Sequence, residues 1–206
     1  MNKAQKVLFF DINTTGPSPQ KHSIWSMSGI IAEIVPNDEI YLIEQFTFTA
    51  APPRGEAMAP SYVSNEHITI PELEALESPD AVHNQKLLPF LRRYINPKHA
   101  GKRLVIIGYN SNSDVRFLTA WFSKRNGLGF HHYFYWHSVD IITLVMDNLK
   151  PDQPRTFRLE TVAEYLGLEI NETLLHSTTY DCRLALDVYA ALKELGINET
   201  EMKGGD

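Results

Sequence analysis

Four runs of apolar residues predict β-strands. Residues 6–12 (KVLFFDI) are almost continuously apolar, as is typical of a strand buried on both faces, and the turn-rich segment NTTGPSPQ follows them. The runs 28–35 and 40–48 flank a turn at 36–38 and predict a β-hairpin. The run 103–108 (RLVIIG) predicts another strand with cover on both faces.

Apolar residues at helical spacing predict the other elements. The predicted helices start at Pro79 for about four turns, and then cover about 113–125, 139–148, 158–166 and 180–195. In the first helix, one face carries Leu87, Leu88, Leu91 and Ile95. The aromatic stretch 130–137 fits neither the spacing of a helix nor the alternation of a strand. Strands that come first, followed by helices that alternate with one more strand, predict an α/β fold with a mixed sheet layered by helices.

The composition is that of a globular domain. Of 206 residues, 43% are hydrophobic and 21% are charged, which excludes collagen-like, low-complexity and disordered chains. Because we find no repeat or linker, we expect one domain over 1–206 with its core at about 6–195. The sequence has no run of about 18 apolar residues, so it predicts no membrane span. Cys182 is the single cysteine, which excludes an internal disulfide, so we expect a cytoplasmic protein without a membrane partner.

The charge balance limits the surfaces that the chain can offer. It has 19 Lys and Arg against 25 Asp and Glu, a formal net charge of −6. This balance argues against a protein that coats nucleic acid with a broad basic surface. It is compatible with an enzyme that gathers carboxylates around metal ions and contacts nucleic acid in one groove.

Three aspartates lie where predicted elements begin or end. Asp11 ends the first strand, and Asp114 follows the strand 103–108 near a helix start; each position alone is equally typical of a turn or a helix cap. Asp181 is different, because it shares the core-facing stripe of the last helix with Ala185 and Val188. A buried carboxylate without a partner is costly, so Asp181 requires a cation.

These aspartates and a nearby histidine predict one chemistry. Aspartates are hard oxygen ligands suited to Mg²⁺ or Mn²⁺, and two such ions can clamp the attacking and leaving oxygens of a phosphodiester. His176 precedes Asp181 by five residues, and a histidine that titrates near neutral pH can remove a proton from the attacking water. The sequence therefore predicts metal-assisted phosphodiester hydrolysis.

The order of these motifs resembles that of the DEDDh, or DnaQ-like, 3′→5′ exonuclease family of the ribonuclease H-like fold. FFDINTTG is similar to the first family motif, Asp-x-Glu-x-Thr-Gly, IIGYNSNSDVRFL to the second, and HSTTYDCRLALDVYAAL to the third, His-x₄-Asp. The resemblance implies a ribonuclease H-like mixed sheet with helices on both faces. It also implies hydrolysis of single-stranded nucleic acid from 3′ ends to 5′-mononucleotides. TFRLETVAEYLGLE is similar to a segment of the exonuclease I group, which digests single-stranded DNA, so we expect this chain to favour DNA over RNA as substrate.

The resemblance implies a role for each site residue. The expected ligands of two Mg²⁺ or Mn²⁺ ions are Asp11, Asn13, Asp114 and Asp181. The expected catalytic residues are His176 as general base together with Asp11, Asp114 and Asp181. Ile12 and Thr15 are expected to contact the 3′ nucleotide. Whether a polymerase or a second copy of the chain is a partner stays open.

Asn13 departs from the family pattern, because it stands where the family has Glu. Its amide oxygen can bind a hard cation but brings no charge, and its nitrogen must point away from the ion. Losing an anionic ligand is expected to cost at least about 10–100-fold in metal affinity or activity and to lower the occupancy of the second ion. Two hypotheses follow: a weakened exonuclease, in which Asn13→Glu raises activity, or an impaired pseudo-exonuclease that binds single-strand ends or a protein partner.

Other candidate residues have ordinary interpretations. Two pairs of basic residues can contact phosphates: Lys124 with Arg125, which can equally be a solvated helix end, and Arg155 with Arg158, which can equally belong to a salt-bridged loop. Most aromatic residues are expected in the core, and Asp140 is expected to cap a helix. His131, His132 and His137 match no zinc-binding pattern.

Overall fold

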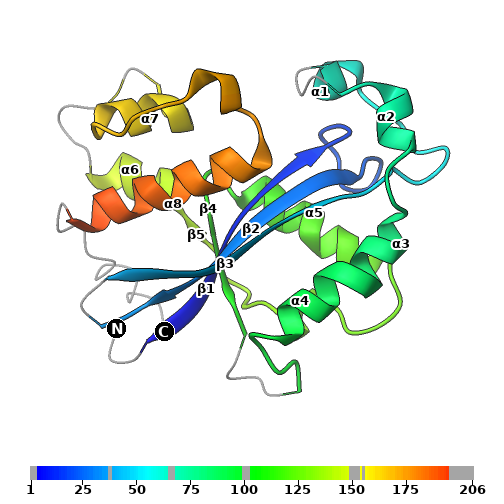
Figure 1. Ribbon diagram of the computed structural model, residues 1–206, viewed down its shortest axis with the longest axis horizontal. Helices are drawn as coiled ribbons and strands as arrows, with labels where there is room; N and C mark the ends of the chain where they lie inside the picture. The colour runs from blue at the N-terminus through cyan, green and yellow to red at the C-terminus, as the bar shows by residue number, and fades with distance from the viewer. Residues whose placement is uncertain are drawn as a thin grey trace.

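The computed structural model describes residues 4–36, 39–64, 68–98, 103–148, 154 and 156–194. Five strands of this part of the chain form one sheet in the order β3-β2-β1-β4-β5 (Figure 1). They are β1 (Gln5–Thr14), β2 (Ile24–Ile34), β3 (Ile40–Thr49), β4 (Val105–Gly108) and β5 (Val139–Asp140). β2 pairs antiparallel with β1 and β3, whereas β4 pairs parallel with β1 and β5, so the sheet is mixed, as predicted.

The central strand β1 divides its side chains between two cores. Val7 and Phe9 belong to one buried cluster, whereas Leu8, Phe10 and Ile12 belong to another. Successive residues of a strand point to opposite faces, so a strand covered on both faces must be apolar at every position. This explains the continuous apolar run in the sequence.

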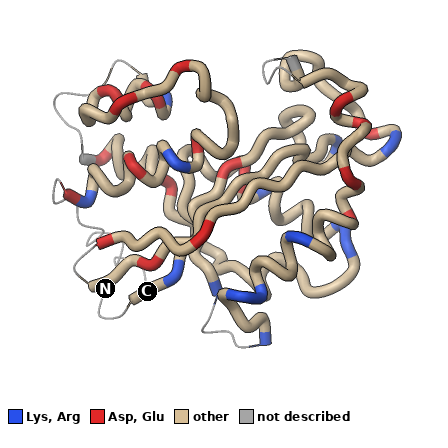
Figure 2. Tube along the Cα trace, viewed as in Figure 1, with Lys and Arg blue, Asp and Glu red and all other residues tan. Residues whose placement is uncertain are grey.

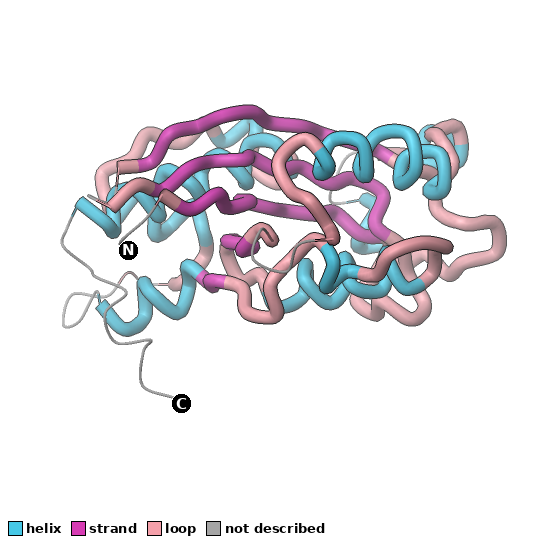
Figure 3. The backbone as a smooth tube through the Cα atoms, turned by 90° about the horizontal axis from the view of Figure 1, so that it is seen from below, coloured by secondary structure: helices cyan, strands magenta, loops and turns pink. Residues whose placement is uncertain are grey.

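Helices cover both faces of the sheet, and the views in Figures 1 and 3 show the long strands β1, β2 and β3 side by side with helices around them. In chain order the helical segments are α1 (Pro60–Ser64), α2 (Ile70–Glu74), α3 (Pro79–Ala81), η1 (Val82–Leu87), α4 (Leu88–Arg92), α5 (Asn112–Ser123), η3 (Phe130–His132), α6 (Ile141–Asn148), α7 (Leu159–Tyr165), η4 (Glu172–Leu174) and α8 (Thr178–Glu194). α6, α7 and α8 pack on the face of Val7 and Phe9, and η1, α4 and α5 pack on the other. The predicted fold class is confirmed. Within the described ranges, no helix combines the length and apolar character needed to cross a bilayer.

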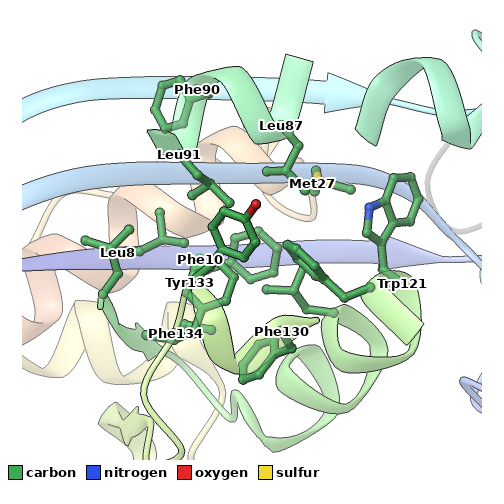
Figure 4. Close-up of a cluster of buried hydrophobic side chains, with 14 of the residues drawn as sticks. Leu8, Phe10, Met27, Leu87, Phe90, Leu91, Trp121, Phe130, Tyr133 and Phe134 are labelled. Carbon is green, nitrogen blue, oxygen red and sulfur yellow. The ribbon is translucent and has the colours of Figure 1, made fainter. Parts of the chain in front are cut away.

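Aromatic side chains fill the core between the sheet and α4 and α5 (Figure 4). Phe10 of β1 and Met27 of β2 lie there with Leu87 and Leu91, as the helical spacing predicts. The stretch 130–137, which fits neither period, contributes buried aromatic rings from a 3₁₀ turn and the segment after it. Its apolar residues are therefore core residues, as expected for most of the aromatics.

Two local elements differ from the sequence prediction, and two short helices lie where it names no element. The pattern predicts a helix start at 139, whereas Val139–Asp140 forms the short strand β5. The apolar residue Val139 lies directly before α6, so the apolar pattern does not separate the strand from the helix. The segment 50–77 contains α1 and α2 in addition to loop. The helix that begins at Pro79 contains a π-helical turn, in which Leu88 N–H donates to His83 O. This wide turn precedes Pro89, whose ring would crowd the carbonyl four residues earlier in a regular α-helix.

Two predicted boundaries lie outside the described residues. They are the hairpin turn at 37–38 and the end of the last helix at 195–196. The strands on either side of that turn are described, and Ile34 pairs with Ile40, so the hairpin itself is confirmed.

Candidate active site

Strand alternation directs Asp11 and Asn13 toward α8. Both residues occupy odd positions of β1, on the face of Val7 and Phe9 that α8 covers. Asp11 pairs across the sheet with Ser28 of β2, and Asn13 pairs two residues further along. The first motif therefore presents its two site residues to the helix that carries the third motif.

Asp140 ends the edge strand β5, and Asp114 follows β4, the strand that pairs parallel with both β1 and β5. Asp140 stands opposite Gly108, the last residue of β4, and Asp114 lies in the first turn of α5. Burial, and then the charge of Asp140, raise the pKa of Asp114 to about 8. Two carboxylates held together in this way favour a proton or a cation between them.

Asp140 also shapes the loop after β4. Its Oδ1 accepts hydrogen bonds from the backbone N–H of Ile142 at 3.2 Å and of Asn110 at 2.8 Å. Asn110 has a φ of 55°, so this carboxylate stabilises a left-handed residue of the second motif. The expected helix cap is present, and the contact with Asn110 adds a role that the sequence alone did not indicate.

Gly108 allows β1 and α5 to approach one another. A Cβ atom at this position would lie 2.9 Å from Phe10 O and 2.8 Å from the Cβ of Ser111. A larger residue would force apart the strand that carries Asp11 and the loop that leads to Asp114.

Asp181 lies in the first turn of α8, and its carboxylate is half-buried. Burial raises its pKa to about 6, while the charge of His176 and a hydrogen bond from the His176 backbone act in the opposite direction. That bond joins His176 N–H to Asp181 Oδ1 at 3.3 Å. The core-facing stripe predicted for this helix is present, since Ala185 and Val188 are both buried.

The charges of all three aspartates act on the buried thiol of Cys182 in α8. Cys182 is 1% exposed. Burial raises its pKa first, the charge of Asp11 raises it next, and Asp114 and Asp181 act in the same direction. The aspartates of the three motifs, which extend from Asp11 to Asp181 in the sequence, therefore all lie near enough to this helix residue for their charges to act on it.

Asn13 and His176 are joined directly. Asn13 Nδ2 donates to His176 O at 3.1 Å, so the amide nitrogen of Asn13 is directed at this carbonyl. The His176 side chain is exposed, and its backbone has a φ of 69°. The sequence motif places His176 near Asp181, but it does not indicate this contact with β1.

A cluster of hydroxyl groups fixes the start of α8 on the sheet. Ser26 Oγ and Ser28 Oγ lie 2.9 and 2.8 Å from Thr178 Oγ1, and Thr47 Oγ1 lies 2.7 Å from Thr179 Oγ1. Sequence analysis missed this cluster, although two serines at alternate positions of β2 and the Thr pair that opens α8 were visible signals. The cluster sets the position of the helix turn that carries Asp181.

A cavity of about 330 Å³ adjoins Asn13 and His176. Its lining includes Ser26, Thr47 and Thr179 of the hydroxyl cluster. Trp25 and Leu175 add apolar surface, and no Asp, Glu, Lys or Arg side chain among the described residues belongs to the lining.

The donor chemistry of the site fits a hard divalent cation. Among the described residues, no three His, Cys, Asp or Glu side chains stand as a ready group that could hold a metal ion. The three aspartates do supply the oxygen ligands that Mg²⁺ and Mn²⁺ prefer. The raised pKa values of Asp114 and Asp181 reflect buried carboxylates whose charge a cation would offset.

The two predicted substrate-contact residues are buried. Ile12 is 9% exposed and belongs to the core beside α5. Thr15 is fully buried, its Oγ1 accepts from Ser23 N–H, and its backbone N–H and C=O are bonded to Ser23 and Ala59. Thr15 therefore shapes the loop after β1, and a contact of either residue with a nucleotide stays a prediction.

The described basic candidates form ion pairs, although Lys124 and Arg125 are expected at a solvated helix end. Lys124 pairs with Glu56 at 3.0 Å and Arg158 with Glu160 at 3.9 Å. Arg125 pairs with Asp80 at 3.3 Å and lies over the Trp121 ring. Figure 2 shows acidic residues along the segment from α7 to η4, whereas Lys and Arg residues are spread over the molecule and include several around η1 and α4. Arg155 lies outside the described residues.

Solved structures share this architecture, although no family model and no curated protein matches the sequence. Exonuclease I of Methylocaldum szegediense superposes with a TM-score of 0.70 at 14% identity, over 96% of this chain and 42% of that one. The chain has a ribonuclease H-like fold. E. coli exonuclease I in complex with a 5cy-dA13 oligonucleotide gives 0.65 at 17% identity, over 96% and 42%. Cell-death related nuclease 4 (CRN-4) gives 0.68 at 15% identity, over 93% and 64%.

These matches establish the fold, while the assignment of catalytic roles rests on the residues described above. The chain spans 42% of the length of each of these two exonuclease I structures. The activity of those longer proteins is therefore a proposal for this chain.

Proposed function

We propose that this chain is a metal-dependent 3′→5′ exonuclease that shortens single-stranded nucleic acid to 5′-mononucleotides, with DNA favoured over RNA. The proposal is supported by the positions of Asp11 in β1, Asp114 in the first turn of α5 and Asp181 in the first turn of α8, and by the effect of all three charges on the buried thiol of Cys182. Three carboxylates at the carboxyl ends of sheet strands and at a helix start provide the acidic site that phosphodiester hydrolysis requires. E. coli exonuclease I, which shares the fold, has been solved with dA13 and dT13 oligonucleotides, which supports single-stranded DNA as the first substrate to test.

Each side chain has a role in this proposal. The three aspartates would bind Mg²⁺ or Mn²⁺, and Asn13 would offer a neutral oxygen. The bound ions would supply positive charge at the scissile phosphate. The exposed imidazole of His176 would accept the proton of the attacking water, and Asp181 would fix the His176 backbone through its 3.3 Å hydrogen bond.

The test is release of 5′-mononucleotides from single-stranded oligonucleotides in Mg²⁺ and in Mn²⁺. Asp114→Asn and Asp181→Asn are expected to lose at least about 10-fold in rate, since each removes a charged metal ligand. Asp187→Asn is the matched control, because Asp187 lies on the same helix and pairs with Arg183 at 3.1 Å. Absence of release by the wild-type protein in both metals would contradict the proposal.

A binding module is the second candidate function. Two observations favour it: Asn13 brings no charge to the acidic site, and its amide nitrogen is engaged by His176 O. In that case the protein binds single-strand ends or a protein partner without cutting them. Fluorescence anisotropy with the same oligonucleotides distinguishes the two functions, because the binding module retains them intact in the presence of metal.

A further inference from the structure

His176 has a backbone conformation that needs support from its surroundings. It is one of two non-glycine residues with positive φ in the described part of the chain, with a φ of 69°. L-residues rarely adopt this left-handed region, and they persist there only where neighbouring groups determine the conformation. The turn around His176 connects η4 to α8, and Ser177 N–H donates to Leu174 O at 3.2 Å within it.

Two site residues hold the peptide groups of His176. Asp181 Oδ1 accepts from His176 N–H at 3.3 Å, and Asn13 Nδ2 donates to His176 O at 3.1 Å. The first contact is local to α8, whereas the second ties the turn to the central strand of the sheet. Both polar groups of a strained residue are therefore fixed by side chains of the acidic site.

Only a side chain with a hydrogen-bond donor can make the contact from β1. An ionised Glu or Asp at position 13 accepts hydrogen bonds and cannot donate one, so it would face the His176 carbonyl with like partial charge. We propose that Asn13 is a positioning residue that fixes the backbone of His176. In place of a charged metal ligand, this position then carries an amide that positions the general base. The catalytic consequence rests on the proposed exonuclease function, whereas the contact itself does not.

Amide hydrogen exchange in metal-free protein tests the contact without any activity measurement. Asn13→Asp removes the donor with little change in size, and Asn13→Ala removes it without adding charge. We expect exchange at the His176 and Ser177 amides to rise about 2- to 10-fold in both variants, as befits the loss of one hydrogen bond. Asn84→Asp is the matched control, because Asn84 Nδ2 likewise donates to a backbone carbonyl, Asp80 O at 2.9 Å, away from the site. Unchanged exchange in both Asn13 variants would overturn the proposal.

A metal titration of activity tests the catalytic consequence. In Asn13→Asp, the added charge is expected to lower the metal concentration for half-maximal rate, while the maximal rate at saturating metal falls about 10-fold or more because His176 is less well held. Asn84→Asp is expected to keep both values. An undiminished maximal rate in Asn13→Asp would overturn the positioning role. If the wild-type protein cleaves nothing, the proposed function fails instead, and hydrogen exchange alone decides whether Asn13 holds the His176 turn.

Discussion

Replacing Asp181 by Asn is expected to stabilise the metal-free protein at neutral and alkaline pH. Burial raises the pKa of Asp181 from its ordinary 3.8 to about 6. The folded state therefore binds this proton more tightly than the unfolded state does. Stability is lost as the pH rises from about 4 to about 6, and the full penalty persists above that range.

The magnitude follows from the pKa difference. A rise from 3.8 to about 6 corresponds to about 3 kcal/mol, at about 1.4 kcal/mol per pKa unit. The carboxylate is only half-buried, and water screens part of this cost, so we expect a gain of about 1–2 kcal/mol for Asp181→Asn at pH 8. The amide oxygen of Asn can still accept the hydrogen bond from His176 N–H. For a domain of this size the gain corresponds to about 2–8 °C in Tm.

Urea denaturation in EDTA at pH 4 and at pH 8 measures this effect. The variant is expected to match the wild-type protein at pH 4 and to exceed it at pH 8. Asp187→Asn is the control, because it loses an exposed ion pair and should change stability by at most about 0.5 kcal/mol at either pH. A variant that is less stable than the wild-type protein at pH 8, or a gain that is equal at both values, would refute the argument.

Three further outcomes are expected. Addition of Mn²⁺ at pH 8 raises the Tm of the wild-type protein, and at a concentration 100 times Kd it raises the free energy of unfolding by about 2.7 kcal/mol. An equal rise in Asp114→Asn would contradict the metal site. Gly108→Ala lowers the free energy of unfolding by about 1–3 kcal/mol in urea denaturation, because its Cβ would lie 2.9 Å from Phe10 O; a neutral effect would show that β1 and α5 are not closely packed. Lys124→Ala leaves the affinity for single-stranded DNA and its salt dependence unchanged, since Lys124 is paired with Glu56, and a shallower salt slope would show that it contacts phosphate.

Local patterns predicted the elements that carry the three motifs. The continuous apolar run of β1 reflects its two covered faces, and the stripe of α8 places Asp181 beside buried residues. Both features arise from side-chain direction within one element, which the spacing of residues specifies. That the three aspartates form one metal site stays a prediction, and the effect of all three charges on the pKa of Cys182 is consistent with it.

Long-range contacts were beyond the reach of the same patterns. β5 has only two residues, so its pairing with β4, which brings Asp140 beside Asp114, leaves no periodic signal. The hydrogen bond from Asn13 to His176 joins residues 163 positions apart. The sequence indicates that Asn13 lacks a charge, which led to the expectation that Asn13→Glu raises activity. It does not indicate that the amide donates to His176 O, a contact that Glu would lose.

Degradation of single-stranded DNA labelled at the 3′ or the 5′ end, compared with RNA of the same sequence, tests the central claim most directly. In Mg²⁺ or Mn²⁺ the wild-type protein is expected to release the 3′ label at once as a mononucleotide and to shorten the 5′-labelled strand stepwise. DNA is expected to be the faster substrate, and Asp181→Ala is expected to be inactive. Intact oligonucleotides in both metals, or equal cleavage by wild-type protein and Asp181→Ala, would contradict the account.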